Sequence, residues 1–127
     1  MMWRTLLRLR AYQAIGCIII AGILYLSLTF HPPTGPDVPL ADKWEHLLAY
    51  GWLMFWWGQL ALGRTRTGLA LAFIALGGAV ELLQGRGGVR MAEWGDFIAN
   101  GLGVALGFAL TQGRFGRLLE AWEQRGA

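Results

Sequence analysis

Four apolar runs, separated by short polar or glycine- and proline-rich connections, constrain the fold of this chain more than any other feature. Hydrophobic residues make up 55% of the 127 positions and charged residues only 15%, which is more apolar surface than a soluble domain of this length can bury. Each run approaches the length of a helix that crosses about 30 Å of hydrocarbon. We therefore predict a single all-α domain, an integral membrane, antiparallel four-helix bundle over residues 1–127, with helices near 12–30, 44–62, 67–83 and 97–110.

The connections between these runs differ in kind. The first contains four prolines, at positions 32, 33, 36 and 39, which remove amide donors and make a stiff, non-helical segment. The second, residues 63–66, is short enough to predict an antiparallel helical hairpin. The third, residues 85–93, contains three glycines and can turn tightly.

A signal peptide is the alternative for the first run, because three arginines precede it. The run is long, however, and its exit Leu28-Thr29-Phe30-His31 lacks an A-x-A-like cleavage site, so we expect it to be retained as a helix.

The distribution of charge predicts the orientation of the helices. With four spans, eight of the eleven basic side chains lie on the side of the two termini, and only Lys43, Arg86 and Arg90 lie on the other. The positive-inside rule then places both termini in the cytoplasm of a bacterial inner membrane. Six of the eight acidic side chains lie on the outer side: Asp37, Asp42, Glu45, Glu81, Glu93 and Asp96.

Residues 113–127 follow the last run and predict a short interfacial helix on the cytoplasmic side. Leu118, Leu119 and Trp122 would form its apolar face, with charged side chains around it.

Three polar sets interrupt the apolar runs, all at the predicted outer face. The first is Lys43, His46 and Tyr50, whose helical spacing makes one column of donors about 10 Å long. Lys43 could instead extend to the interface and Tyr50 belong to an aromatic belt. A histidine one turn below the interface still needs a partner.

The other two sets come from later runs. Glu81 and Gln84 share a helix face. The Glu81 carboxylate could serve as a proton carrier, a general base, a cation ligand or one half of an interhelical ion pair. Asp96 opens the last run, where a carboxylate can simply complement the helix dipole. Asn100, one turn deeper, needs an interhelical hydrogen bond.

Ala99, Gly103 and Gly107 recur every four residues in the last run. Such a strip of small residues lets another helix approach closely, either within the chain or in a second copy that forms a homo-oligomer.

Several classes of site have no support in the sequence. The arginines are dispersed and form no basic stripe, which argues against nucleic acid as a partner. A single cysteine, Cys17, excludes an intrachain disulfide and a cysteine metal cluster. A divalent cation held by Glu81, Asp96 and His46 is conceivable, but their spacing is not diagnostic. No Walker loop, nucleophile elbow, zinc-protease or dinucleotide motif is present, so we expect no cofactor and no resident metal.

Taken together, three motifs resemble the VanZ-like family of small bacterial integral membrane proteins. They are K43-x-x-H46-x-x-x-Y50, E81-L-L-Q84 and R90-x-x-E93-x-x-D96-F-I-A-N100-G-L-G103. The resemblance covers roughly residues 42–107. It implies a multi-helix membrane protein linked to the cell envelope, since one founding member is associated with resistance to the glycopeptide antibiotic teicoplanin. It also implies a functional set: Lys43, His46, Tyr50, Glu81, Gln84, Arg90, Asp96 and Asn100. Glu93 departs from the family pattern, which often has serine there.

These observations support several functions. The first is an outward-facing polar pocket that binds a lipid-linked phosphate or glycan of the cell envelope, with Arg90 and Lys43 meeting anionic oxygen. The second is a structural or assembly subunit whose polar residues lock the helices together. A third, an intramembrane hydrolase with Glu81 or His46 as base, lacks a nucleophile or metal motif, and transport of a proton or ion is a fourth. Whether the chain is an enzyme is left open.

Overall fold

The structure, a computed structural model, describes residues 2–28, 41–86 and 94–126. It is all-helical, which confirms the predicted class, and two of its helices are long and apolar. The elements are α1 (Leu9–Leu28), α2 (Ala41–Leu60), α3 (Gly63–Arg86), α4 (Trp94–Leu110), a 3₁₀ helix (Arg114–Arg117) and α5 (Leu118–Gly126).

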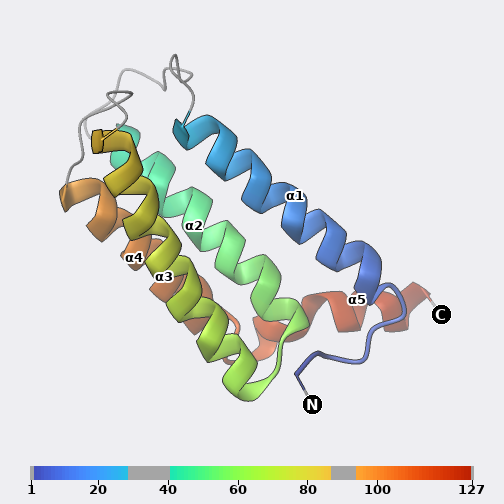
Figure 1. The fold of residues 1–127 in the computed structure, drawn as a ribbon. Coiled ribbons are helices and arrows are strands. Elements are labelled where there is room, and N and C mark those ends of the chain that lie inside the picture. The colour runs from blue at the N-terminus through green and yellow to red at the C-terminus, as the bar shows by residue number, and fades with distance from the viewer. Residues whose placement is uncertain (1, 29–40, 87–93, 127) are drawn as a thin grey trace.

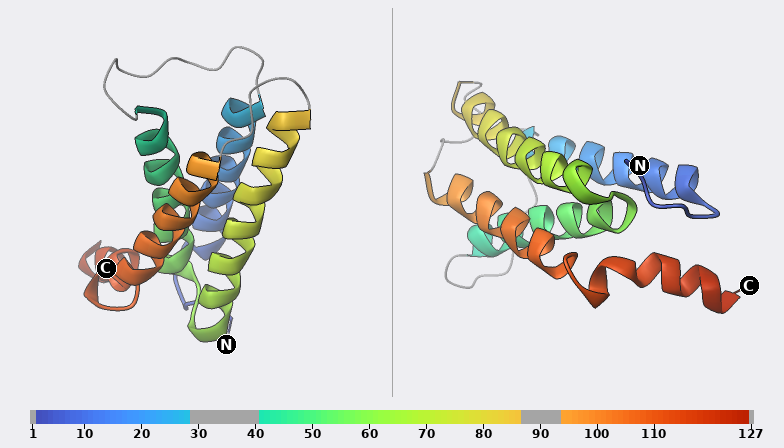
Figure 2. Two further views of the ribbon diagram at one scale, coloured as in Figure 1. Left: turned by 90° about the vertical axis from the view of Figure 1, so that its left-hand side faces the viewer. Right: turned by 90° about the horizontal axis from the view of Figure 1, so that it is seen from below.

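Helix α2 lies at the centre of the structure and packs against α1, α3 and, most extensively, α4. The first turns of α2 and α4 and the last turns of α1 and α3 lie at one end of the molecule (Figure 1). Both chain termini and the turn between α2 and α3 lie at the opposite end. Figure 2 shows α4 crossing α2 at an inclination and α5 turning away from α4.

Small residues allow α4 to approach α2. Gly103 faces the carbonyl oxygen of Leu47, and a Cβ atom on Gly107 would lie 2.5 Å from the carbonyl oxygen of Gly51. Gly103 and Gly107 are buried. The glycine strip that the sequence indicated therefore packs against another helix of the same chain.

The connection between α2 and α3 is shorter than predicted. Helix α3 begins at Gly63, so residues 63–66, which we assigned to the link, form its first turn. Gly63 has a φ of 51°, a left-handed conformation that glycine adopts without a Cβ penalty. Because that residue reverses the chain, Ala61 and Leu62 suffice as the connection.

The structure buries several polar side chains beside its apolar core, and it exposes many large apolar side chains. Large apolar side chains are exposed on the outer faces of the long helices, among them Ile18, Tyr25, Leu48, Leu71 and Leu106. The buried residues include a polar group: His46, Gln59, Glu81, Asp96, Asn100 and Thr111.

The end that carries the termini is held together by hydrogen bonds through Gln59. This side chain is 2% exposed. Its amide nitrogen donates to the carbonyl oxygen of Phe115 at 2.6 Å, and its oxygen accepts from the backbone nitrogen of Leu118 at 2.9 Å. Arg4 donates to the carbonyl oxygen of Gln59 and forms an ion pair with Glu120 at 2.8 Å. The N-terminal segment, α2 and α5 are thereby joined.

The predicted C-terminal helix is present as α5, preceded by the 3₁₀ helix. Leu118 and Trp122 are exposed, whereas Leu119 packs against the core. Two of the three residues assigned to its apolar face are thus available to an interface, and the third faces the protein.

Candidate functional site

Side chains from α2, α3 and α4 meet in a buried polar cluster near the end opposite the termini. We define the polar cluster as the six residues Lys43, His46, Tyr50, Glu81, Asp96 and Asn100, which are all members of the set predicted from the sequence. Five of the six are at most 9% exposed, the exception being Lys43. Residues distant in the chain therefore form one site.

Lys43 and Asp96 form the ion pair of the polar cluster. The ammonium group of Lys43 donates to Asp96 Oδ1 at 2.6 Å, and the two side chains are 23% and 2% exposed. The Lys43 stem passes over Gly95, where an added Cβ atom would lie 2.7 Å from Lys43 Cε. The residue before Asp96 thus has to be small for the lysine to keep its present path. Asp96 also opens α4, as the sequence indicated.

His46 lies between the two polar residues of α4. Its Nδ1 atom is 3.0 Å from Asn100 Oδ1, and its Nε2 atom is 3.5 Å from Asp96 Oδ2. His46, which was expected to need a partner, therefore contacts Asn100, which was expected to need an interhelical hydrogen bond.

Two buried hydrogen-bond donors in the polar cluster have no acceptor among the described residues. They are the hydroxyl of Tyr50 and the amide nitrogen of Asn100, and both side chains are 1% exposed. Leaving such a donor unsatisfied costs roughly 1–3 kcal/mol. Buried polar groups are normally paired, so these two atoms call for a functional or structural explanation.

Helix α3 is shaped to receive Asn100. A Cβ atom on Gly77 would lie 3.0 Å from Asn100 Nδ2, so the absence of a side chain there makes room for the amide. Gly77 precedes Glu81 by four residues and therefore lies on the same helix face, one turn deeper. The Asn100 amide thus lies against α3 at Gly77, one helical turn from Glu81 along the chain.

Glu81 completes the polar cluster from the side of α3. It is 5% exposed. One ligand-type atom each from His46, Glu81 and Asp96 lies within 4.8 Å of the others. Of the residues described, these three are the ones that could hold a metal ion together.

The described members of the polar cluster include one basic side chain, Lys43, and two acidic side chains, Glu81 and Asp96. Acidic groups therefore outnumber the basic group in the described part of the cluster, which favours contact with a cation.

Two residues of the predicted set are not placed in the polar cluster. Gln84 belongs to α3, but its side chain is not among those that the structure describes. Arg90 lies outside the described residues. The predicted roles of both remain predictions.

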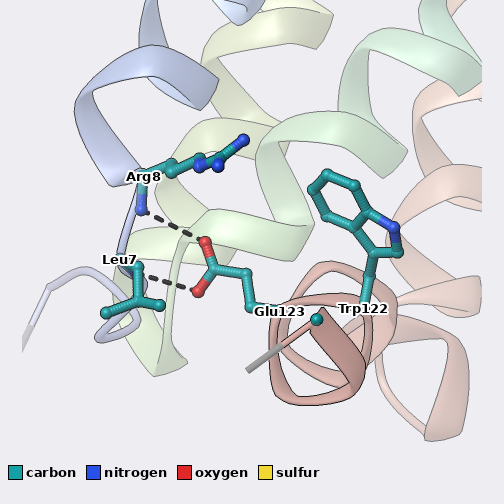
Figure 3. A pocket seen from close by; sticks show the side chains of 5 residues that line it. Leu7, Arg8, Trp122 and Glu123 are labelled. Atoms are coloured by element: carbon teal, nitrogen blue, oxygen red, sulfur yellow. Dashed lines mark hydrogen bonds between the residues drawn. The ribbon is translucent and has the colours of Figure 1, made fainter.

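A separate cleft lies at the end that carries the termini, between the start of α1 and α5. It has a volume of about 220 Å³ and is lined by Leu7, Arg8, Trp122, Glu123 and Gly126. Figure 3 shows the carboxylate of Glu123 directed at the backbone of Leu7 and Arg8. The cleft contains none of the polar cluster residues, and its one carboxylate is engaged by the chain itself.

Glu123 attaches α5 to the first turn of α1. Its two oxygens accept from the backbone nitrogens of Leu7 at 2.8 Å and Arg8 at 3.1 Å, and from the Tyr12 hydroxyl at 2.8 Å. Desolvation acts to raise the pKa of this carboxyl, but the three hydrogen bonds and the charge of Arg8 outweigh it and hold the pKa below the usual 4.5. A carboxylate at a helix N-terminus is also favoured by the helix dipole.

We expect α5 to detach from α1 when Glu123 is protonated. Because its pKa is lower in the folded state, the ionised form stabilises the contact above pH 4.5, and this contribution is lost as the pH falls through the lowered value. The protection of the Leu7 and Arg8 amides from hydrogen exchange, measured relative to the intrinsic exchange rate at each pH, should fall in that acidic range. In Glu123→Gln the exchange should already be fast at neutral pH, whereas Glu45→Gln, which alters an exposed carboxylate of α2, should behave as the wild type. Slow exchange in Glu123→Gln would contradict this role.

Gln59 is the main structural residue that the sequence reasoning did not single out. The signal available was a lone amide within the aromatic-rich run of α2, one residue after Gly58. Its partners lie more than 50 positions away, so no local pattern could identify them.

No protein-family model, no curated protein and no solved structure matches this chain.

Proposed function

We propose that this chain is a multi-pass protein of the bacterial cytoplasmic membrane whose polar cluster binds the phosphate or glycan headgroup of a lipid-linked cell-envelope precursor. The observation that carries the proposal is the pair of buried donors in the polar cluster, the Tyr50 hydroxyl and the Asn100 amide, which have no hydrogen-bond partner among the described residues. Phosphate and sugar oxygens accept hydrogen bonds from such donors.

The membrane location draws on helix length and on surface composition. Helix α1 and residues Gly63–Leu83 of α3 are long and apolar enough to cross a bilayer. The large apolar side chains on the outer faces of the helices would contact lipid, and the polar side chains would face the interior, where intramembrane polar groups are normally placed. In this arrangement α1 to α4 form an antiparallel four-helix bundle, with both termini in the cytoplasm.

The resemblance to VanZ-like proteins supports the same assignment. It connects the residues of the polar cluster with the cell envelope and, through one member, with glycopeptide resistance. In the proposed orientation the polar cluster faces outward, where envelope precursors are processed, and Arg90 would supply the positive charge that the described part of the cluster lacks.

Native mass spectrometry tests this function. The protein should be recovered from the membrane fraction and, in detergent, carry an adduct whose mass fits a lipid phosphate. Arg90→Ala should lose the adduct at an unchanged melting temperature, while Arg64→Ala, which removes an exposed arginine at the start of α3, should keep it. Recovery from the soluble fraction, or an equal adduct in Arg90→Ala, would contradict the proposal.

A second candidate function is a structural or assembly subunit. It is favoured by the fact that the Lys43–Asp96 ion pair and the His46–Asn100 contact both join α2 to α4. In that case Glu81→Ala should mainly lower the melting temperature and leave no separate ligand defect.

A further inference from the structure

We infer that His46, Glu81 and Asp96 form a binding site for one divalent transition-metal ion, for which Zn²⁺ is the best-fitting class. The inference goes beyond headgroup binding and does not require it. It draws on the donor set, on the orientation of His46 and on the two buried polar atoms nearby.

The donor set suits such an ion. One imidazole and two carboxylates, all buried, offer nitrogen and oxygen atoms that lie within 4.8 Å of one another. Zn²⁺ binds such ligands at about 2.0–2.2 Å, so two ligands of a tetrahedral ion lie about 3.4 Å apart. His46 Nε2 and Asp96 Oδ2 are 3.5 Å apart, which is long for a hydrogen bond but suitable for two ligands of one ion. Ca²⁺ would need six to eight oxygens, more than these residues supply.

The orientation of His46 points to the same conclusion. Asn100 Oδ1 is an acceptor, so the 3.0 Å contact makes Nδ1 the protonated ring nitrogen. In the neutral ring, Nε2 then presents its lone pair to the carboxylate of Asp96. Two acceptors that face each other at 3.5 Å in a buried site are suited to a cation bound between them. A ring nitrogen that donates to an oxygen while the other binds the ion is the usual arrangement of histidine ligands.

The surroundings provide the outer contacts of such a site. Asn100 orients the imidazole, and Lys43 holds Asp96 Oδ1, which leaves Oδ2 directed at His46. Tyr50 lies one turn from His46 on α2, and its buried hydroxyl has no partner among the described residues. It could therefore hydrogen-bond a water molecule that completes the four ligands of the ion.

A bound ion would add two positive charges beside the acidic side chains of the polar cluster. An ion with an open fourth position could then contact an anionic oxygen directly. This consequence depends on the proposed headgroup function, whereas the metal site itself does not.

The test is metal binding by the full chain in detergent, after removal of lipid and treatment with a chelator. Co²⁺ should bind with a stoichiometry of one per chain, give the intense visible absorption of a low-coordinate site, and be displaced by Zn²⁺. Glu81→Gln and His46→Gln should weaken binding by more than the roughly tenfold to hundredfold loss typical of outer contacts. Glu45→Gln, which removes an exposed carboxylate next to His46 in the chain, should bind as the wild type.

Circular dichroism of each metal-free variant shows whether it is folded. The wild-type result decides the matter even if a variant fails to fold: absence of saturable one-to-one binding of Co²⁺ and Zn²⁺ overturns the inference. Equal binding by a folded Glu81→Gln variant would also overturn it. Because the sample contains no lipid, a negative result in the adduct experiment has no bearing on this one.

Discussion

Gly103→Ala is expected to destabilise the protein by roughly 3 kcal/mol, the upper part of the range for inserting one methyl group into a tightly packed contact. A Cβ atom at this position would overlap the carbonyl oxygen of Leu47 and lie 3.0 Å from the backbone nitrogen of Gly51. Backbone atoms cannot rotate away as the end of a side chain can, so α4 would have to move off α2. That movement would also separate the α2 and α4 residues of the polar cluster.

Gly101→Ala is the matched control, because it lies two residues away on α4 and nothing is within 4 Å of its Cβ position. Alanine there should be neutral or stabilising by up to about 1 kcal/mol, the difference in helix propensity. Thermal unfolding in detergent, followed by fluorescence of the seven tryptophans, compares the two variants. Similar melting temperatures for both would show that the α2–α4 contact is looser than the structure indicates.

Lys43→Met should lower the free energy of unfolding by about 3 kcal/mol, the lower end of the range for breaking a buried ion pair. Asp96 is 2% exposed, so removal of the lysine leaves its carboxylate desolvated without that cation. The expected loss of stability lies at the lower end of that range because Lys43 itself is 23% exposed. The methionine keeps most of the length of the stem over Gly95, and the change therefore acts mainly through charge.

The double variant Lys43→Met/Asp96→Asn should recover most of this loss, because neither side chain is then charged. The coupling free energy from the two single variants and the double variant measures the pair. Arg64→Met removes the same charge from an exposed position and should change stability by less than about 0.5 kcal/mol. Additive effects of Lys43→Met and Asp96→Asn would mean that the two residues do not act as a pair.

The predicted helices agree with the structure to within a few residues, and the differences have local causes. The spacing of Ala99, Gly103 and Gly107 correctly indicated a close helix contact, because small residues at intervals of four line up on one face. The start of α3 was misplaced, since the sequence does not reveal that Gly63 takes a left-handed conformation and shortens the turn. Gln59 was overlooked because its partners come from the other end of the chain.

The candidate site was predicted as a set of residues but not as an arrangement. Helical periodicity placed Lys43, His46 and Tyr50 on one face of one helix, and nothing in the sequence could pair His46 with Asn100 rather than with Glu81. A divalent cation held by Glu81, Asp96 and His46 was conceivable from the sequence but was not predicted, because ligands from three helices have no diagnostic spacing.

The sequence by itself determined the helical class, the apolar runs and the residues that must be polar within them. These follow from local chemistry: periodicity of side chains, the conformational limits of proline and glycine, and the cost of placing charge in apolar surroundings. Only the tertiary structure decided that His46 Nε2 faces Asp96 Oδ2, with Glu81 nearby. Those distances depend on how closely α2, α3 and α4 approach one another. That approach is set by packing between residues far apart in the chain: Gly103 of α4 packs against the backbone of α2, and Gly77 of α3 packs against Asn100 of α4.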